Sequence, residues 1–411
     1  MTRRWAILAA AGVGIRIALW IWDPHPLVYG DSGSYLSAAL NPRPYIIHPK
    51  GVSLFWNLTG VGHIVLAQTA LTVGLVWAVW DVSKKFWVAA VVALSPLTIA
   101  YERVLLSEHL FATLLAVGIA LLLRRSFLAG FAFGCAAVTR SIGVGLAIPL
   151  AVELFRHRRA LAAALALFAL VLVVYVARYV YPTTRSAAVA FVGPNAISVV
   201  APLAECPPAP FDICKWRSEH PNAIIFGAGG PVQARVKAAG WAAADRELRS
   251  IVFTAIRNDP VGYWRGYFGR IPHLFGLGFH YDHAGTDTVY GYSRQMLDRV
   301  EGPRVRPGRN AVRTRAWDVV VKVSTVLGSI VVVWGLLGRP PRPVWIVVAL
   351  LTLGSIAFND ATARFLYPLV PLMLCFVRSP TELRMCFPRD TDRGFNGGMF
   401  EPRDQGEDRG Q

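Results

Sequence analysis

A single carboxylate, Asp31, stands among small and aromatic residues directly after the first long apolar stretch of the chain. The surrounding sequence is Val-Tyr-Gly-Asp-Ser-Gly-Ser-Tyr, which ends at Tyr35. Because a carboxylate can take a proton from a hydroxyl nucleophile, Asp31 is a candidate general base. Aspartate before Ser-Gly-Ser is also a good beginning for a helix, so a capping role is the structural alternative.

Further ionisable side chains lie at the ends of apolar stretches or just inside them. A charge at such a position is costly, and it marks a candidate functional site. Arginine and lysine can hold a phosphate group and stabilise its charge. The candidate phosphate-binding residues are Lys50, Arg103, Arg140 and Arg364. The candidates for supporting acid–base chemistry or substrate binding are Tyr35, His48, Glu102, Glu108, His109 and Asp360.

Structural roles are the alternatives for these residues. Glu102 and Arg103 could form a loop ion pair, and Glu108 with His109 could form a buried structural pair. Arg140 could extend from a short hairpin toward the membrane surface. A base combined with a phosphate clamp, in a cleft open to lipid, nevertheless suits transfer of a group from a lipid-linked phosphate donor.

The composition is that of a membrane protein. Hydrophobic residues make up 54% of the 411 residues, charged residues only 16%, and the mean hydropathy is +0.43. A soluble domain carries nearer a quarter charged residues. Long apolar runs, among them 104–123 and 160–176, approach the roughly 20 residues that cross a bilayer. We therefore expect an all-α polytopic membrane protein.

About ten transmembrane helices are expected. They fall near 5–22, 61–80, 86–100, 104–123, two short spans within 127–155, then 160–179, 317–337, 344–358 and 365–377. The formal net charge of +17 would indicate a nucleic-acid partner in a soluble chain. Here much of it falls in short clusters between the spans, which indicates orientation, so no nucleic-acid partner is expected.

The basic clusters predict the sidedness of the chain. Lys84-Lys85, Arg124-Arg125 and the cluster that begins at Arg156 share one side in a ten-span arrangement. Since such clusters stay inside, both termini are expected in the cytoplasm. The candidate residues for chemistry then surface together on the extracytoplasmic face of the plasma membrane.

Four regions are expected. Residues 1–180 form a transmembrane module of about seven spans, with a catalytic loop at 23–60 whose short helices lie at the interface. Residues 181–316 form a small extracytoplasmic domain, with a helix over 233–258 and an interfacial helix near 263–268, where aromatic residues mix with arginine. Residues 317–378 carry the last spans, and 379–411 form a disordered cytoplasmic tail.

Cysteine and histidine patterns add two expectations for the extracytoplasmic domain. Cys206 and Cys214 lie close together in sequence, and in an oxidising compartment they would form a disulfide; two unrelated thiols are the alternative. His280, Asp282 and His283 form a short His-Tyr-Asp-His sequence without a distant partner of strong type. We interpret it as a polar loop and not as a metal site.

Several short motifs, in their order along the chain, resemble the GT-C superfamily of membrane glycosyltransferases. This group includes the dolichyl-phosphate-mannose-dependent protein mannosyltransferases and the bacterial lipid A aminoarabinose transferase. The motifs are Gly30-Asp31-Ser32-Gly33-Ser34-Tyr35-Leu36, then His48-Pro49-Lys50-Gly51, then Ser95-Pro96 with Glu102-Arg103 and Ser107-Glu108-His109-Leu110, and finally Ala363-Arg364-Phe365-Leu366-Tyr367-Pro368. The resemblance spans roughly 5–377 and is best in the first 155 residues.

The resemblance implies an inverting glycosyltransferase that uses a polyprenyl-phosphate sugar, with mannose or arabinose favoured, and a glycan, glycolipid or protein acceptor of the cell envelope. In such enzymes the acid of the first outside loop is the catalytic base, which assigns the role to Asp31. Some relatives use paired acids and a divalent metal; no second acid follows Asp31 closely, so no metal or other cofactor is expected. The Ala-, Val- and Arg-rich composition is typical of a GC-rich bacterium such as an actinobacterium.

Two functions from other classes are the alternatives. A lipid-linked sugar flippase or transporter would also have many spans and intramembrane charges, but transporters place these near the bilayer midplane on related halves. The charges here cluster at one face, and no two-fold repeat is apparent. A membrane scaffold that binds partners through 181–316 would leave Glu108 and His109 unexplained.

Overall fold

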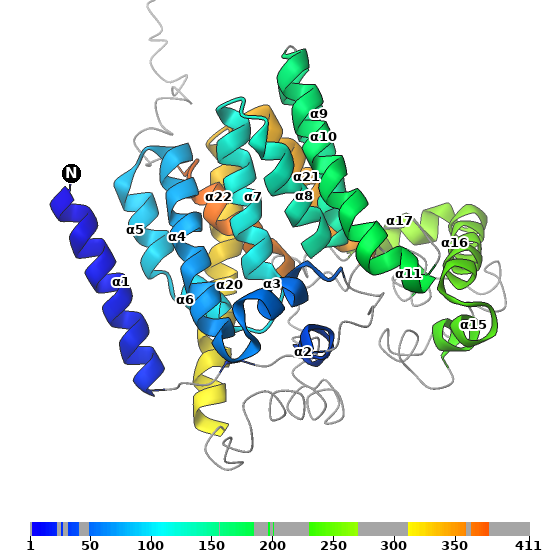
Figure 1. Ribbon diagram of the computed structural model, residues 1–411, viewed down its shortest axis with the longest axis horizontal. Helices are drawn as coiled ribbons and strands as arrows, with labels where there is room; N and C mark the ends of the chain where they lie inside the picture. The colour runs from blue at the N-terminus through cyan, green and yellow to red at the C-terminus, as the bar shows by residue number, and fades with distance from the viewer. Residues whose placement is uncertain are drawn as a thin grey trace, which may run out of the picture. The chain divides into compact units, whose positions relative to one another are not determined.

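The computed structural model is helical in all its regular elements, within the residues that it describes (Figure 1). Those residues are 2–22, 26–27, 32–40, 49–155, 157–184, 196–197, 200, 230–269, 311–358 and 363–377. One compact unit covers Met1–Val377 and a second covers Arg378–Gln411. The tail predicted for 379–411 lies outside the described residues, and the division into 1–180, 181–316 and 317–378 stays a prediction.

The helices follow the apolar stretches of the sequence. The N-terminal elements are α1 (Thr2–Trp22), α2 (Ser32–Leu40), α3 (Gly51–Thr59), the 3₁₀ turn η1 (Val61–His63), α4 (Ile64–Ser83), α5 (Phe86–Leu94), α6 (Pro96–Arg103) and α7 (Glu108–Leu123). The middle elements are α8 (Leu128–Thr139), the 3₁₀ turn η2 (Ser141–Leu146), α9 (Ala147–Leu154), α10 (Arg158–Tyr175), the π-helical turn η3 (Val176–Val180) and α11 (Tyr181–Thr184). The later elements are α15 (Pro231–Ala239), α16 (Trp241–Asn258), α17 (Pro260–Gly269), α20 (Ala311–Leu337), α21 (Arg342–Phe358), the 3₁₀ turn η6 (Ala363–Leu369) and α22 (Val370–Leu374).

Three helices are long and apolar enough to cross a membrane, namely Arg3–Trp22, Ile64–Ser83 and Arg158–Val180. Shorter apolar helices occupy Glu108–Leu123, Leu128–Thr139, Ser141–Leu154, Val323–Leu337 and Arg342–Gly354. The described part of the chain is thus an all-α protein with membrane-spanning character. The number of ten spans, and the side on which each terminus lies, stay predictions.

Helix boundaries differ from the sequence expectation at three places. The span expected over 86–100 is two helices, because Pro96 has no N–H to donate and Ser95 begins α6 instead, its side chain accepting from the Leu97 amide at 3.2 Å. The helix expected from 104 begins only at Glu108. The helix expected over 233–258 is interrupted at Gly240, whose φ of 78° is left-handed.

The polar connections of α4 and α7 lie at the same end of the packed helices. Lys84 follows α4 and Arg124 follows α7. Both are ion-paired with Asp81 of α4, at 2.5 Å for Lys84. Basic residues after a helix complement its negative C-terminal dipole. The two basic clusters that the positive-inside rule placed on one side therefore occupy one end of the α4–α7 pair.

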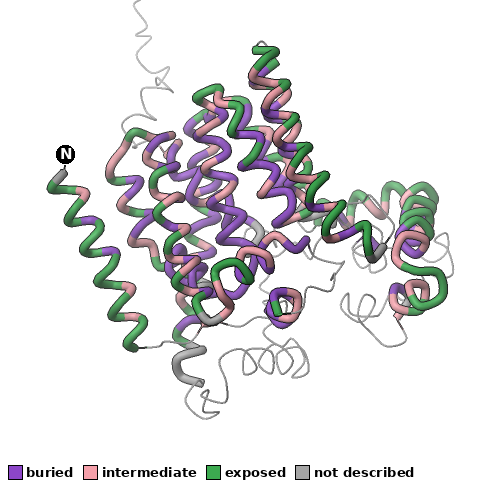
Figure 2. Tube along the Cα trace, viewed as in Figure 1, coloured by how far each residue is buried: buried purple, intermediate pink, exposed green. Residues whose placement is uncertain are grey.

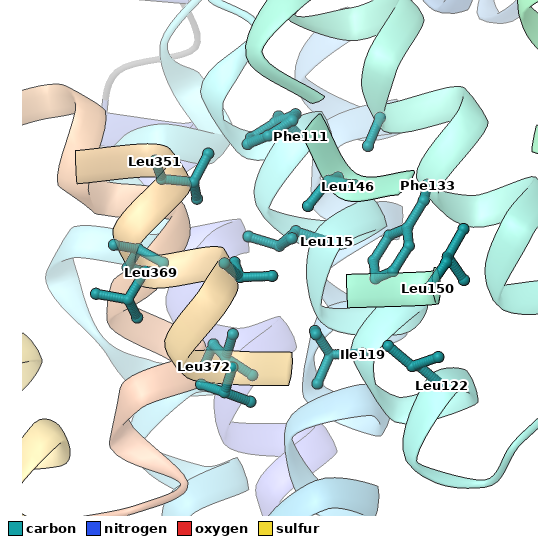
Figure 3. Packing of buried hydrophobic residues seen from close by; sticks show 14 of the residues in the cluster. Phe111, Leu115, Ile119, Leu122, Phe133, Leu146, Leu150, Leu351, Leu369 and Leu372 are labelled. Atoms are coloured by element: carbon teal, nitrogen blue, oxygen red, sulfur yellow. The ribbon is translucent and has the colours of Figure 1, made fainter. Parts of the chain in front are cut away.

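The core is formed by α7, α8 and the C-terminal helices. α8 packs against both α7 and α10, and α4 packs along α7. Buried positions are concentrated on α7 and α8, whereas α1 is largely exposed (Figure 2). Figure 3 shows apolar side chains from several elements meeting in one cluster. Its labelled members are Phe111, Leu115, Ile119, Leu122, Phe133, Leu146, Leu150, Leu351, Leu369 and Leu372.

Glycines allow close helix contacts in this core. A Cβ on Gly130 of α8 would lie 1.9 Å from the Ala164 carbonyl oxygen of α10, and one on Gly118 of α7 would lie 2.2 Å from the Phe133 ring. Small residues at such crossings let helix backbones approach, which is how helices associate in lipid, where the hydrophobic effect gives little driving force. The α7–α8–α10 packing therefore depends on these two positions.

Gly130→Ala should destabilise the protein, by about 1–3 kcal/mol for overpacking, because the backbone oxygen of Ala164 cannot move aside as a side chain can. The measurement is the thermal unfolding midpoint of the purified protein in one detergent. Gly14→Ala is the matched control, since a Cβ there meets nothing within 4 Å on an exposed part of α1. Equal midpoints for the two variants would contradict the packing described.

Candidate functional site

The polar candidates gather at the end of the α4–α7 pair opposite to Asp81. α7 has 16 residues, so Glu108 at its beginning is separated from Leu123 at its end by roughly 22 Å, at about 1.5 Å per residue. His109 contacts Gln68 and Thr72 near the beginning of α4. The two helices therefore run in the same direction, with a basic end and an end that carries the candidate site.

The segment around Asp31 is attached to this second end through described residues before and after it. Before it, Leu27 pairs with the segment after α6: its amide donates to the Arg103 carbonyl at 2.8 Å, and its carbonyl accepts from the Leu105 amide at 3.0 Å. After it, the Tyr35 hydroxyl of α2 donates to the Ser107 side chain at 3.3 Å. Asp31 itself lies outside the described residues.

Glu102 is the buried acid at this end. Its side chain is 2% exposed, and it forms a two-pronged ion pair with Arg16 of α1, in which Arg16 Nε lies 2.8 Å from Glu102 Oε2. The Thr72 hydroxyl donates to Oε1 at 2.5 Å, and the Thr69 hydroxyl donates to Oε2 at 3.4 Å. Four donors thus surround one carboxylate, which holds its charge in place.

Arg16 also completes the broken α5–α6 helix. Its Nη1 donates to the Ala93 carbonyl at 3.1 Å. Pro96 cannot donate to a preceding carbonyl, so the end of α5 is left with carbonyl groups that lack a helical partner. The Arg16 side chain therefore joins three parts of the sequence at one point: α1, the end of α5, and Glu102 of α6.

His109 lies next to this ion pair and is 1% exposed. Its Nε2 lies 3.1 Å from both the Gln68 carbonyl oxygen and the Thr72 hydroxyl, and its Nδ1 lies 2.8 Å from the Tyr367 hydroxyl. Because a carbonyl can only accept, Nε2 carries the proton of a neutral imidazole, and Nδ1 accepts from Tyr367. Tyr367 is stacked on Tyr101, with ring centroids 3.8 Å apart.

These bonds form one continuous chain of donors. It runs from the Tyr367 hydroxyl to His109, from His109 to the Thr72 hydroxyl, and from Thr72 to Glu102. Both ring nitrogens of His109 and both oxygens of Glu102 are engaged within it. The geometry therefore fits a positioning role for Glu102 and His109 better than proton transfer to a substrate.

Glu108 and Arg140 form a second charged pair. Glu108 Oε1 lies 3.2 Å from Arg140 Nη1, and their side chains are 3% and 14% exposed. Glu108 begins α7, where a carboxylate is favoured by the helix dipole, and Arg140 follows the end of α8. The Arg140 guanidinium also lies over the Phe111 ring, 6.0 Å from its centroid. The carboxylate and the ring together fix the direction of this cation.

Lys50 and Arg103 lie at the same end. The Lys50 amide donates to the Tyr175 hydroxyl of α10 at 3.0 Å, and the next residue, Gly51, approaches α8 so closely that a Cβ would lie 2.6 Å from the Val138 carbonyl. Burial lowers the pKa of the Lys50 amine to about 8. The Arg103 guanidinium lies over the Trp317 ring, 5.4 Å from its centroid.

Several predicted residues cannot be placed. Like Asp31, the residues His48, Asp360, Cys206 and Cys214 lie outside the described part of the chain, as do His280, Asp282 and His283. The backbone of Arg364 belongs to η6, but its side chain is outside the described residues. Their roles, and the predicted disulfide, stay predictions. Within the described ranges no three metal-binding side chains come together, and the predicted independence of metal stays untested.

The sequence reasoning missed Arg16, Gln68 and Thr72. A signal for Arg16 was present, because an arginine inside an apolar helix needs a partner. Gln68 and Thr72 are four residues apart in α4, which places them on one face of the helix. What could not be read from the sequence is which acid Arg16 meets, since Asp23, Asp31, Glu102 and Glu108 all lie near the ends of apolar stretches.

Arg16→Met should lower the thermal unfolding midpoint strongly, because it leaves the buried Glu102 charge without its cation, a loss of about 3–5 kcal/mol. The matched variant is Arg16→Met combined with Glu102→Met, which removes both charges and should recover most of the lost stability. Both are measured in one detergent against the unmodified chain. A double variant no more stable than Arg16→Met would show that the ion pair does not carry this stability.

No protein-family model, no curated protein and no solved structure matches the chain. The site offers a carboxylate fixed by four donors, a partly buried arginine oriented by an acid, and a lysine of lowered pKa. These groups lie at the end of the helix pair to which the loop around Asp31 is attached.

Proposed function

We propose that the chain is an inverting glycosyltransferase of the GT-C type that acts at a membrane. It would move a sugar, with mannose or arabinose favoured, from a polyprenyl-phosphate donor to a glycan, glycolipid or protein acceptor on the extracytoplasmic face of a bacterial plasma membrane. The bilayer environment is supported by the apolar helices. The proposal needs no metal and no nucleic acid.

One observation carries the proposal: residues from five helices form one series at the same end, in which side chains that the sequence singled out are connected through Thr72 and Thr139, which it did not. Gly51, after Lys50, contacts Thr139, which precedes Arg140. Arg140 is paired with Glu108, and the neighbouring His109 is joined through Thr72 to Glu102. This series supports a common site for an acid, a phosphate clamp and their supports.

In the proposed reaction Asp31 takes the proton of an acceptor hydroxyl. The acceptor oxygen attacks the anomeric carbon from the side opposite to the phosphate, which inverts its configuration. The bond between that carbon and the phosphate oxygen breaks, and the polyprenyl phosphate leaves with the electron pair. Its charge is held by Lys50, Arg103, Arg140 and Arg364.

The other candidates have supporting roles in this scheme. Glu108 orients the Arg140 guanidinium through the ion pair at 3.2 Å. Glu102 and His109 hold α1, α4, α6, α7 and η6 together through their hydrogen bonds. Tyr35, His48 and Asp360 are proposed to contact substrate near the loop that carries Asp31.

A lipid-linked sugar flippase or transporter is the second candidate, and the buried charges Arg16 and Glu102 favour it, since intramembrane charges are common along transport pathways. Two features argue the other way. Arg16 is 6 residues from the end of α1, which is about 9 Å from that end at 1.5 Å per residue, whereas transporter sites lie near the midplane. The charge of Arg16 is also paired with that of Glu102.

Asp31→Asn should reduce sugar transfer by at least about 10²-fold, the usual scale for loss of a general base. The purified protein in lipid is given polyprenyl-phosphate mannose or arabinose with a mixture of cell-envelope acceptors, and transferred sugar is measured. Glu247→Gln, on the exposed side of α16, is the carboxylate control and should keep full activity. Equal rates in Asp31→Asn and the unmodified chain would remove Asp31 from the mechanism, and movement of intact donor without transfer would favour the flippase.

The affinity for the donor should weaken as the pH rises through about 8, because Lys50, with its pKa lowered by burial to that value, is charged below it and neutral above it. A phosphodiester donor keeps a single negative charge over this range, so its titration does not interfere. The KM for the donor is measured between pH 7 and 9. Lys50→Arg stays charged throughout and should remove the rise; a rise of the same size in Lys50→Arg would exclude Lys50 as its source.

A further inference from the structure

The helical pair α16–α17 has an inner face that is fixed to the membrane helices. Asp259 begins α17, with its Oδ1 accepting from the Gly262 amide at 2.9 Å, and Pro260 takes the first helical position. The Tyr267 side chain is buried, and its hydroxyl donates to the Leu353 carbonyl of α21 at 2.8 Å. Tyr263 packs against the same core cluster.

The outer face of the pair is apolar and exposed. Val261, Trp264 and Phe268 follow each other at spacings of three and four residues, which places them on one side of α17. They are 67%, 48% and 53% exposed, and Phe253 on α16 is 70% exposed. Figure 2 shows exposed positions along both helices.

Cations lie on this same outer face. Arg257 is four residues after Phe253, and Arg265 is four residues after Val261, so each shares a helix side with an exposed apolar residue. Both arginines are exposed. Aromatic and aliphatic side chains combined with arginine on one face are the pattern of a helix that lies in the plane of a membrane surface.

The hydrogen bond to α21 places the outer face of α17 at the depth that is typical of an interfacial helix. Leu353 is five residues before Phe358, where α21 ends, which is about 7.5 Å along the helix axis. Interfacial helices bury their apolar face by about 5–10 Å. Leu353 and Trp345 of α21 are themselves exposed, so α17 is attached to a shorter apolar helix that also has exposed apolar side chains.

We propose that α16–α17 is a leaflet-binding element: Phe253, Val261, Trp264 and Phe268 enter the acyl region of the leaflet, and Arg257 and Arg265 bind the phosphate groups of anionic lipids. The occupant is the lipid surface, because α17 is attached to an apolar helix with exposed apolar side chains and the charges of the face complement phosphate. This proposal goes beyond sugar transfer and does not rest on it.

The depth of α17 is measured with a nitroxide label on Phe268→Cys in the full chain, reconstituted in lipid nanodiscs. Collision rates with oxygen, which concentrates in the acyl region, are compared with those of a water-soluble nickel complex. Labelled Glu247→Cys is the matched control, because Glu247 is exposed and lies about 120° around α16 from Phe253. Unmodified protein treated with the label gives the background from native cysteines. The expected result is an oxygen-to-nickel ratio several-fold higher at 268 than at 247.

Two outcomes would overturn the leaflet assignment. Equal ratios at the two positions would place the face in water, and a label at 268 that is immobile and shielded from both reagents would place it against protein, such as a second copy of the chain. If Phe268→Cys does not fold, Val261→Cys on the same face serves with the same criteria.

The headgroup contacts are tested with the same label. Nanodiscs of phosphatidylcholine alone are compared with nanodiscs that contain phosphatidylglycerol as well. The label should lie deeper with the anionic lipid, and Arg257→Gln combined with Arg265→Gln should abolish that difference while keeping α17 folded. A difference that persists in the double variant would overturn the role of the two arginines. Sugar transfer is not read in either experiment, so failure here leaves the proposed reaction untouched.

Discussion

The ion pair between Arg16 and Glu102 is the interaction on which the candidate end depends, that is, the end of the α4–α7 pair that carries the candidate site. α1 is largely exposed and has few other attachments: Trp5 packs edge-on against Trp80 and Phe86 near one end, and Trp22 lies against Trp317 near the other. Arg16 supplies the polar link between them, and it meets both Glu102 and the carbonyl of Ala93. A buried charge without its partner is far more costly than the same site built from apolar residues, so neither residue can change alone.

The apolar environment explains why polar contacts determine the arrangement. Helices in lipid gain little from the hydrophobic effect, and they associate through close packing and hydrogen bonds. Gly118 and Gly130 provide the close packing between α7, α8 and α10. The chain from Tyr367 through His109 and Thr72 to Glu102 provides the directional contacts. Residues that are 258 positions apart, His109 and Tyr367, are thereby fixed relative to each other, and Tyr367 lies three residues after Arg364.

The sequence predicted the helical class, the apolar stretches and the polar candidates between them, because each of these is a local property. The boundaries at Ser95-Pro96 and Gly240 were missed although their residue types are clear helix breaks, since the apolar run on either side was taken as one element. The partners could not be predicted. The structural alternative for Glu102 was an ion pair with Arg103, its neighbour in sequence, but its carboxylate is bound to Arg16, 86 positions away. Only the packing of α1 against α5 and α6 brings these two together.

The partners of each carboxylate indicate whether that acid has a structural role. Asp81 is paired with Lys84 and Arg124 at the basic end, Glu102 accepts from Arg16, Thr69 and Thr72, and Glu108 is paired with Arg140. A carboxylate whose oxygens are bound by neighbouring side chains serves to hold those side chains in place. Within the described residues, the acids at the candidate end thus hold helices together through ion pairs and hydrogen bonds. In the proposed reaction the proton is taken by Asp31, which lies between Leu27 and Tyr35, the two residues that attach this segment to the same end.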